Sequence, residues 1–413
     1  MGFISMGFMI PRFESREIEE SRGWLLLFGR RKTGKTFLVR NMLKYDFYFF
    51  VGRGRKIFLE EDGKVESLPY EVFMERLRHL IGEDVVIVID EFQRLPDDFL
   101  DFLHYAKSKS RSKLILVGSS IQVSRRILSR RSPLLGIIKP IHIGLIRPLD
   151  ILLELSKHFP PYKAIQLSSL LRDPWILEFI DPKGSIEEVL EQIIQAIKYN
   201  ARSLVGEVFQ EEEKELTERY EAILKALGDG RNTPSQVANY VSSLLTTPLK
   251  SQDVKKYISN LVEMGIAEKI KIYGKKRHIY RIESPLLDLF HYLDARYGFY
   301  EVDLPIELLR DKAIDKLPFY YENFVVKLFA EILGCEVQKT FKPEFDGVLV
   351  RGKRLVAVIE VKYGVANRND LARFLAKTDG WKCRKILVAK EAEEMGELEV
   401  YTPEKIMDLI RKR

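Results

Sequence analysis

Cysteine is nearly absent from this sequence: 413 residues contain two, Cys335 and Cys383. So few cysteines exclude a disulfide framework and a cysteine-based metal cluster, and they suit a reducing cytoplasm. The sequence also lacks an apolar run long enough to cross a bilayer. Its short apolar start, residues 1–10, has neither the basic first residues nor the cleavage site of a signal peptide. We therefore expect a cytoplasmic protein with no membrane partner.

No single sign of charge dominates, because 67 Lys and Arg residues face 60 Asp and Glu residues, for a net charge of +7. This small basic excess is compatible with nucleic acid binding but does not establish it. Hydrophobic residues make up 46% of the chain, which excludes wholesale disorder. A chain of 413 residues is expected to form about two to four domains.

The first part of the chain alternates apolar runs and helix-like segments. The runs 24–28, 85–89 and 114–117 are continuously apolar, which is typical of parallel strands covered on both faces. We expect residues 1–150 to form an α/β core. The sequence of residues 151–215 predicts only helices, which prolines separate. We expect these helices to form a cap on the α/β core.

A different order of elements follows. Residues 216–284 predict three helices and a hairpin, the order of a winged helix-turn-helix. Residues 285–318 predict a helical connector, and residues 319–413 a compact α/β domain. The predicted fold class is therefore α/β and multidomain.

The sequence G-R-R-K-T-G-K-T matches the phosphate-loop pattern G-x-x-x-x-G-K-[ST], with an apolar strand before it and a helix after it. In such loops the backbone N–H groups surround phosphate oxygens, the lysine reaches the β- and γ-phosphates, and the final hydroxyl binds Mg²⁺. We therefore predict an ATP and Mg²⁺ site. Its loop residues are Gly29, Arg30, Arg31, Lys32, Thr33, Gly34, Lys35 and Thr36.

Two acidic residues end the second apolar run. Asp90 would help to hold Mg²⁺ with Thr36, and Glu91 would orient or deprotonate the attacking water. Ser119 or Ser120, after the third run, could sense the γ-phosphate, and a polar helix cap is the equally weighted alternative.

At this point the sequence resembles the archaeal ATPase family, P-loop ATPases related to the AAA+ and STAND proteins. The segment F-E-S-R-E at 13–17 resembles its "F-x-x-R-E" box, and S-P-L-L-G at 132–136 resembles its "S-P-L-x-G" segment. The resemblance implies ATP binding, with Phe13 and Arg16 near the base or the domain junction. Ile137 and Ile138 replace an expected basic residue, so no arginine finger is assigned. The candidates for that role are Arg125, Arg126, Arg130, Arg131 and Arg147.

The predicted winged helix is basic in two places. Its third helix carries Lys255 and Lys256, and the tip of its hairpin carries Lys275, Lys276 and Arg277. A helix in the major groove and a wing on phosphates would bind DNA in this way. A domain-packing or protein-contact role is the alternative, at nearly equal weight.

Carboxylates and a lysine gather in the last domain. A tight turn at Gly352 and Lys353 would fold residues 347–350 back against residues 355–358, and the same register would bring Asp346 next to Ile359 and Glu360. Lys362 lies on the same strand face as Glu360. Two carboxylates could hold Mg²⁺, or Mn²⁺, and Lys362 could stabilise charge during phosphodiester cleavage.

This pattern resembles the PD-(D/E)xK restriction-endonuclease-like fold. Glu322 matches the acidic helix position of that fold, and Pro343 lies three residues before Asp346 rather than next to it. The archaeal ATPase family often carries such a domain at its C-terminus. The resemblance implies a metal-dependent nuclease with Glu322, Asp346, Glu360 and Lys362 as catalytic residues.

The sequence leaves three functions open. The first is an ATPase that acts on DNA and cleaves it, and that could form homo-oligomers. The second is an ATP-controlled switch for DNA or partner binding with an inactive nuclease-like module. The third is a transcription regulator that works through the winged helix alone.

Overall fold

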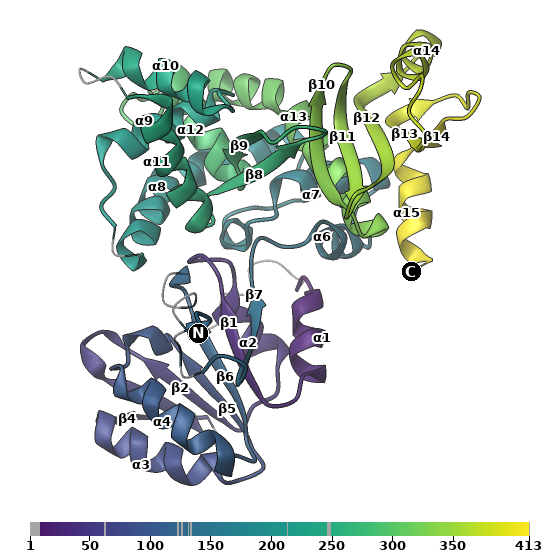
Figure 1. The fold of residues 1–413 in the computed structure, drawn as a ribbon. Coiled ribbons are helices and arrows are strands. Elements are labelled where there is room, and N and C mark those ends of the chain that lie inside the picture. Colours follow the sequence, from purple (N-terminus) through teal and green to yellow (C-terminus); the bar gives the residue numbers. More distant parts are fainter. Residues whose placement is uncertain are drawn as a thin grey trace. The chain divides into compact units, whose positions relative to one another are not determined.

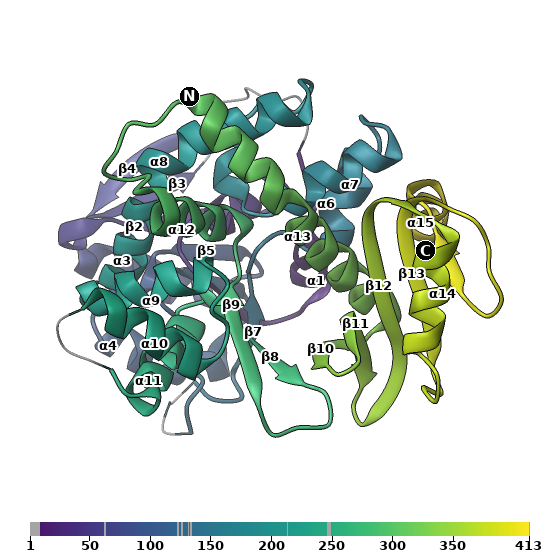
Figure 2. The same cartoon turned by 90° about the horizontal axis from the view of Figure 1, so that it is seen from above.

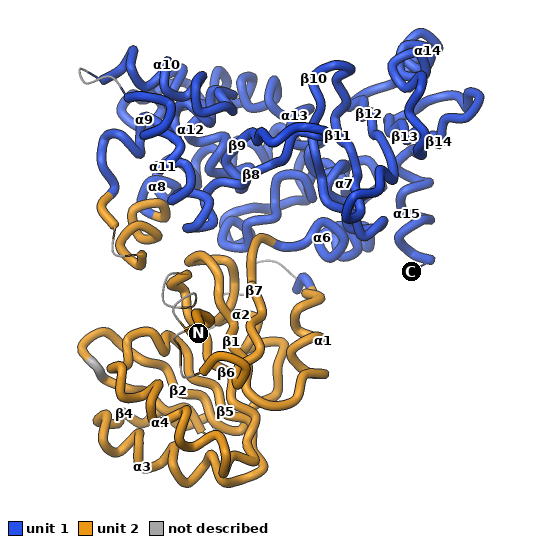
Figure 3. Tube along the Cα trace, viewed as in Figure 1, with its two compact units in different colours: residues 1–10, 146–203, 216–413 blue, residues 11–145, 204–215 orange. Residues whose placement is uncertain are grey.

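The computed structural model describes residues 9–412 apart from 62, 122, 123, 125, 126, 131, 133, 213 and 246–248. Two compact units divide the chain (Figure 3). Unit 2 contains residues 11–145 and 204–215, and the remaining described residues form unit 1. The five segments expected from the sequence are a finer division and stay a prediction.

Unit 2 is built on a seven-stranded sheet in the order β4-β3-β2-β5-β6-β1-β7 (Figure 1). Neighbours among β2, β5, β6, β1 and β7 pair in parallel, and β3 and β4 add an antiparallel hairpin to β2. The strands are β1 (Trp24–Phe28), β2 (Phe47–Val51), β3 (Ile57–Glu61), β4 (Lys64–Leu68), β5 (Val86–Asp90), β6 (Lys113–Gly118) and β7 (Ile138–His142).

Helices cover both faces of this sheet, which is why its strands are apolar throughout. Alternate residues of β1 point to opposite faces, so Leu26 packs with α3 (Tyr70–Ile81) and α4 (Asp98–Ala106). Leu25 and Leu27 pack with α1 (Phe13–Glu20) and α2 (Lys35–Met42).

The three strands expected from the apolar runs are confirmed as β1, β5 and β6, and their parallel pairing is confirmed too. The hairpin of β3 and β4 was not expected, because β4 is mostly exposed and carries polar residues. Parallel pairing brings the carboxyl ends of β1, β5 and β6 to one edge of the sheet, where the phosphate loop and the acidic residues lie.

Unit 1 begins with helices, as expected for the segment after residue 150. They are α6 (Pro148–Leu155), α7 (Pro161–Leu170) and α8 (Ile186–Glu211). Pro161 starts α7, in agreement with its expected role as a break. Residues 204–211 of α8 belong to unit 2.

The expected order of three helices and a hairpin is confirmed between residues 218 and 282. The elements are α9 (Glu218–Gly228), α10 (Pro234–Leu244), α11 (Ser251–Glu263), β8 (Ala267–Ile272) and β9 (His278–Ile282). A capping box of Thr233 and Gln236 fixes the start of α10. Val254, Ile258 and Leu261 form the buried face of α11.

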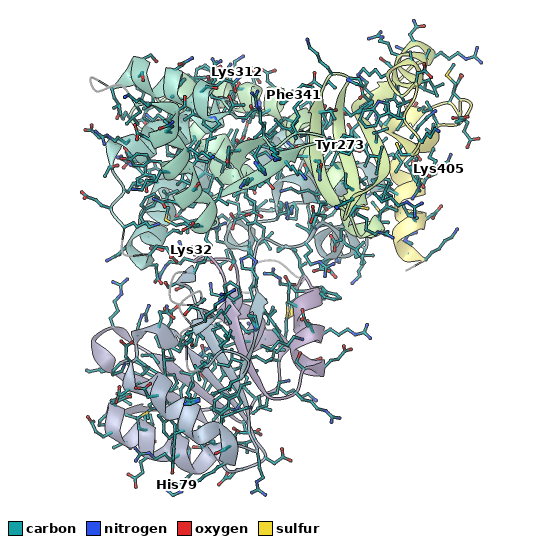
Figure 4. All side chains as sticks on the ribbon, in the orientation of Figure 1. Lys32, His79, Tyr273, Lys312, Phe341 and Lys405 are labelled. Carbon is teal, nitrogen blue, oxygen red and sulfur yellow. The ribbon has the colours of Figure 1, made fainter. Side chains whose placement is uncertain are left out.

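The hairpin does not stand alone, which the sequence did not indicate. Strand β8 pairs in parallel with β10 (Glu336–Phe341), so both belong to one sheet in the order β14-β13-β12-β11-β10-β8-β9 (Figure 2). Beyond β8, the N–H of Tyr273 donates a 2.9 Å hydrogen bond to the carbonyl of Lys339. Tyr273, labelled in Figure 4, also packs against Trp381 with ring centroids 5.6 Å apart.

Two further helices precede that sheet. They are α12 (Pro285–Tyr297) and α13 (Ile306–Leu333). The boundary expected at residue 318 falls inside α13, because the helix continues through Pro318. Proline usually ends a helix, but Leu317 before it and Tyr320 and Tyr321 after it are buried and keep the helix together.

The remaining elements follow the expected order of strands and helices. They are β11 (Glu344–Arg351), β12 (Arg354–Ala366), α14 (Arg368–Lys377), β13 (Arg384–Ala392), β14 (Glu399–Tyr401) and α15 (Pro403–Arg411). The tight turn at Gly352 and Lys353 is confirmed, since Arg351 pairs with Arg354.

Candidate functional site

The phosphate loop lies between β1 and α2, and two glycines shape it. A Cβ atom at Gly29 would lie 2.1 Å from the carbonyl oxygen of Ile143, so a larger residue cannot occupy this position. Gly34 takes a left-handed conformation (φ 85°) directly before α2. The first N–H groups of α2 therefore face the loop without a side-chain cap, as anion binding requires.

Lys35 is buried inside this loop. Its Nζ donates 2.9 Å hydrogen bonds to the carbonyls of Gly29 and Arg30. Burial lowers the pKa of Lys35 to about 8, while the nearby carboxylates of Glu91 and Asp90 oppose that shift. An ammonium group held in this way among loop carbonyls suits a phosphate oxygen, which would supply the missing negative charge.

The other loop residues differ in their surroundings. Thr33 is buried and its hydroxyl donates to the carbonyl of Arg30 at 2.9 Å. Arg30 is buried as well. Lys32 is exposed (Figure 4) and takes a positive φ of 61°.

Asp90 receives three hydrogen bonds at the end of β5. The hydroxyls of Thr36 and Tyr48 each donate to its Oδ2 at 2.7 Å, and the N–H of Glu91 donates to its Oδ1 at 2.9 Å. Asp90 is 1% exposed. A threonine hydroxyl beside a carboxylate forms an oxygen ligand pair of the kind that Mg²⁺ prefers.

Glu91 follows in a left-handed conformation (φ 60°), which is unfavourable for a residue with a side chain. Its Oε2 pairs with Arg94 at 2.8 Å and accepts a 2.9 Å hydrogen bond from Gln93. Burial raises the pKa of Glu91, which Arg94 opposes and the carboxylates of Glu211 and Asp90 reinforce. A carboxylate with a raised pKa is a suitable base for water.

Ser119 joins the same group of side chains from the end of β6. It accepts a hydrogen bond from Gln93 at 3.1 Å and donates to Glu211 at 2.6 Å. Arg31 of the loop pairs with Glu207 at 2.5 Å and with Glu211 at 2.9 Å. The structure thus brings together six of the residues proposed from the sequence: Arg31, Lys35, Thr36, Asp90, Glu91 and Ser119.

Sequence reasoning missed several residues of this site. Gln93 and Arg94 lie close to Glu91 in the chain, and this proximity was the available signal. Glu207 and Glu211 lie one helical turn apart on α8, far along the chain, and no motif marks them.

Arg12 was also missed, one residue before the segment that resembles the "F-x-x-R-E" box. Its buried guanidinium donates to the carbonyl of Thr33 at 2.8 Å and pairs with Glu14 at 3.0 Å. Phe13 is 52% exposed, and Arg16 is exposed and pairs with Glu20 on α1. Arg12 rather than Arg16 therefore supports the loop, and nucleotide contacts by Phe13 and Arg16 stay predictions.

The arginine-finger candidates remain unassigned. Arg125, Arg126 and Arg131 lie outside the described residues, as does Pro133 of the "S-P-L-x-G" segment. Arg147 pairs with Glu331 inside unit 1.

A second cluster of charged side chains lies on β11, β12 and α13 in unit 1. Gly347 pairs with Ile359, one residue further than the turn alone predicts, because the register shifts between Leu349 and Val350. Oδ2 of Asp346 accepts a 2.7 Å hydrogen bond from the N–H of Val361. Glu360 pairs with Lys377 of α14 at 3.0 Å, a partner that the sequence did not indicate.

Glu322 of α13 belongs to this cluster. Burial raises its pKa to about 7, and the charge of Asp346 adds to the shift. Lys339 and Lys362 act in the opposite direction on Glu322. The four residues expected at this site are therefore close enough to interact. Among the described residues, however, no group of three or more His, Cys, Asp or Glu side chains is arranged to hold a metal ion.

The basic residues of the helix and hairpin are exposed: Lys255, Lys256, Lys275, Lys276 and Arg277. Lysines 255, 269 and 271 surround His278, whose pKa is lowered first by burial and then by their charges. The charges of Lys255 on α11 and of Lys269 and Lys271 on β8 therefore act on the same side chain.

The glycine-rich loop between a parallel strand and a helix, with acidic residues at the neighbouring strand end, defines unit 2 as a P-loop nucleotide-binding domain. Residues 21–138 match a family described as "AAA domain". This part of the chain is accordingly an AAA-type P-loop ATPase domain. No described helix has the length and apolar character needed to cross a membrane.

Solved structures with a similar fold include the Walker-type ATPase PABY2304 of Pyrococcus abyssi. It is 19% identical with a TM-score of 0.51, over 68% of this chain and 96% of that chain. The ORC2 protein of Aeropyrum pernix is 11% identical with a TM-score of 0.43, over 75% of this chain and 97% of that chain. The ORC1 protein of A. pernix, in complex with DNA, is 16% identical with a TM-score of 0.32, over 68% and 91%. No curated protein matches the chain.

Proposed function

We propose that this protein hydrolyses ATP with Mg²⁺ and couples hydrolysis to DNA binding and to metal-dependent phosphodiester cleavage. The observation that carries the ATPase part is the 2.7 Å hydrogen bond from Thr36 to Asp90. These are the two side chains that would hold Mg²⁺, and the fold brings them together from α2 and β5.

Each side chain of the nucleotide site has one task in this proposal. Lys35 and the N–H groups at the start of α2 bind the phosphates, and Mg²⁺ would neutralise phosphate charge. Glu91 positions the attacking water and accepts its proton, for which its raised pKa is suited. Ser119 donates to the terminal phosphate.

The test of the ATPase is turnover of ATP by the Lys35→Ala variant. Loss of the ammonium should reduce phosphate release at least about 100-fold. Lys44→Ala is the matched control, because Lys44 is exposed just beyond α2. Unchanged turnover in the Lys35 variant would remove the phosphate loop from the proposal.

The nuclease part is supported by the convergence of Glu322, Asp346, Glu360 and Lys362. Two or three carboxylates there would take Mg²⁺ or Mn²⁺, which would activate water, and Lys362 would stabilise the developing phosphate charge. Four substrates would be tested: single-stranded DNA, duplex DNA, branched DNA and RNA. We expect the purified protein to cleave one of them in the presence of Mg²⁺ or Mn²⁺, and each reaction would be run with and without ATP. The Asp346→Ala variant should not cleave, and exposed Asp379→Ala should.

An ATP-controlled switch with an inactive nuclease-like module is the second candidate. It is favoured by the pairing of Glu360 with Lys377, and by the lack of a metal-holding group among the described residues. ATP turnover without cleavage of any substrate would support this candidate over the first.

DNA binding belongs to both candidates. The exposed Lys255, Lys256, Lys275, Lys276 and Arg277 would contact phosphates from a winged helix-turn-helix. Because β8 shares a sheet with β10, bound DNA would lie on the same body as the carboxylate cluster. We also propose that the protein forms a homo-oligomer and is located in the cytoplasm.

A further inference from the structure

One carboxylate in the nucleotide site has no task in the chemistry above. Glu211 lies in the last turn of α8, in the part of that helix that belongs to unit 2. Its Oε1 pairs with Arg31 of the phosphate loop at 2.9 Å. Glu207, one turn earlier, pairs with the same guanidinium at 2.5 Å.

The second oxygen of Glu211 reaches the other side of the site. Oε2 accepts a 2.6 Å hydrogen bond from the hydroxyl of Ser119 and lies 3.4 Å from Nε2 of Gln93. That Gln93 nitrogen also donates to Glu91, the expected base. A single carboxylate therefore connects the phosphate loop, the end of β6 and the partner of the base. Arg31, Gln93, Arg94, Glu207 and Glu211 line one pocket.

These contacts are the ones that a terminal phosphate would need. The γ-phosphate of ATP is an anion that takes hydrogen bonds from a hydroxyl at the end of β6 and from cations of the loop. A carboxylate bound to the same hydroxyl and to Nη1 of the same arginine competes with it, because the hydroxyl has one proton to donate and like charges repel at contact distance. ADP lacks the γ-phosphate, and its β-phosphate would bind to the loop N–H groups and Lys35 without a contact to Ser119.

We propose that Glu211 occupies the γ-phosphate position of this site and that ATP, but not ADP, displaces it from Ser119 and Arg31. The proposal rests on the proposed nucleotide site and adds its regulation. Displacement frees Nη1 of Arg31 to bind the terminal phosphate, while Nε stays paired with Glu207, and it releases the contacts of Glu211 at the end of α8. The conformation of the last turn of α8 then depends on whether the bound nucleotide is a triphosphate.

The charge of Glu211 can be removed with little change in shape. In a Glu211→Gln variant the amide can still accept a hydrogen bond from Ser119, but the repulsion of the γ-phosphate is gone. The Kd of a nonhydrolysable triphosphate analogue, AMPPNP, should fall about tenfold, whereas the Kd of ADP should stay within about twofold. Isothermal titration calorimetry with both nucleotides measures the ratio. Glu215→Gln is the matched control, because Glu215 is exposed four residues further along the same part of unit 2.

Each outcome of the titration is informative. Equal Kd values for AMPPNP in the wild type and the Glu211 variant would overturn the displacement, and weaker AMPPNP binding in the variant would do so too. If neither protein binds any adenine nucleotide, the proposed nucleotide site itself fails, which is a different result.

Hydrogen exchange of the unaltered protein gives a test that does not depend on the variant folding. Backbone amides at the end of α8, residues 208–211, should exchange faster with AMPPNP than with ADP, because Glu211 loses its contacts to Arg31 and Ser119. Equal or slower exchange with AMPPNP would overturn the proposal.

Discussion

The hydroxyl of Thr36 donates a 2.7 Å hydrogen bond to Oδ2 of Asp90, although 54 residues separate the two in the chain. Thr36 is in the first turn of α2, and Asp90 is the last residue of β5. Because β1 and β5 both pair in parallel with β6, their carboxyl ends meet at one edge of the sheet. That edge is the proposed nucleotide site.

Arg12 should be a structural support of the phosphate loop. Replacing it with alanine removes the donor to the carbonyl of Thr33 and leaves the buried carboxylate of Glu14 without its cation. Such a loss should lower the free energy of unfolding by about 3 kcal/mol. Denaturant unfolding measures it, and Arg16→Ala is the control, because that exposed pair with Glu20 should contribute little. Equal effects of the two substitutions would contradict this role for Arg12.

Glu91 should act in hydrolysis and not in binding. Glu91→Gln keeps the size of the side chain but cannot accept a proton, so turnover should fall at least about 100-fold. ATP affinity should remain within about threefold, since Lys35 and the loop are unchanged. The measurements are phosphate release and nucleotide titration, with exposed Glu75→Gln on α3 as the control. Normal hydrolysis in the Glu91 variant would remove it from the role of base.

The tip of the hairpin should bind DNA phosphates. Neutralising Lys275, Lys276 and Arg277 together should weaken binding. It should also make the salt dependence shallower, by about 0.9 in the log–log slope for each lost phosphate contact. Fluorescence anisotropy at several salt concentrations measures both effects.

A control for this triple variant neutralises three exposed lysines outside β8 and β9, Lys157, Lys183 and Lys412. It keeps the net charge change equal, so a matching loss of affinity would show that overall charge, and not the hairpin, binds DNA.

His291 on α12 should make the protein less stable in mild acid. Burial lowers its pKa to about 4, compared with 6.5 for an exposed histidine. The charges of Lys225 and Arg202 also lower the pKa, whereas the charge of Asp294 raises it. Between pH 6.5 and pH 4 the unfolded chain binds a proton that the folded one does not, so stability falls as pH falls. The loss should reach about 3 kcal/mol by pH 4.

Denaturant unfolding of the wild type and His291→Leu at pH 7 and pH 4.5 measures this contribution. Leucine is close in size and does not titrate, so the variant should lose less stability on acidification. The same pH dependence in both proteins would show that His291 is not the source.

Features of the fold that depend on residues close together in the chain could be predicted from the sequence. The spacing of Gly29, Gly34 and Lys35 requires a strand before and a helix after, and the apolar runs placed Asp90 at a strand end. The turn at Gly352 and Lys353 placed Asp346 near Glu360, but the register shift between Leu349 and Val350 was not predictable. In each case neighbouring residues in the chain carry the signal.

The sequence by itself determined the P-loop ATPase fold, the phosphate loop and the carboxyl-end residues, because backbone geometry and apolar periodicity act over short stretches of chain. Only the tertiary structure decided that Glu207 and Glu211 contact Arg31 and that Arg12 supports Thr33. It also decided that β8 joins β10 in one sheet and that Lys377 pairs with Glu360. These contacts join residues far apart in the chain whose types are common on any surface. Their partners are chosen by packing of whole elements, which no local pattern records.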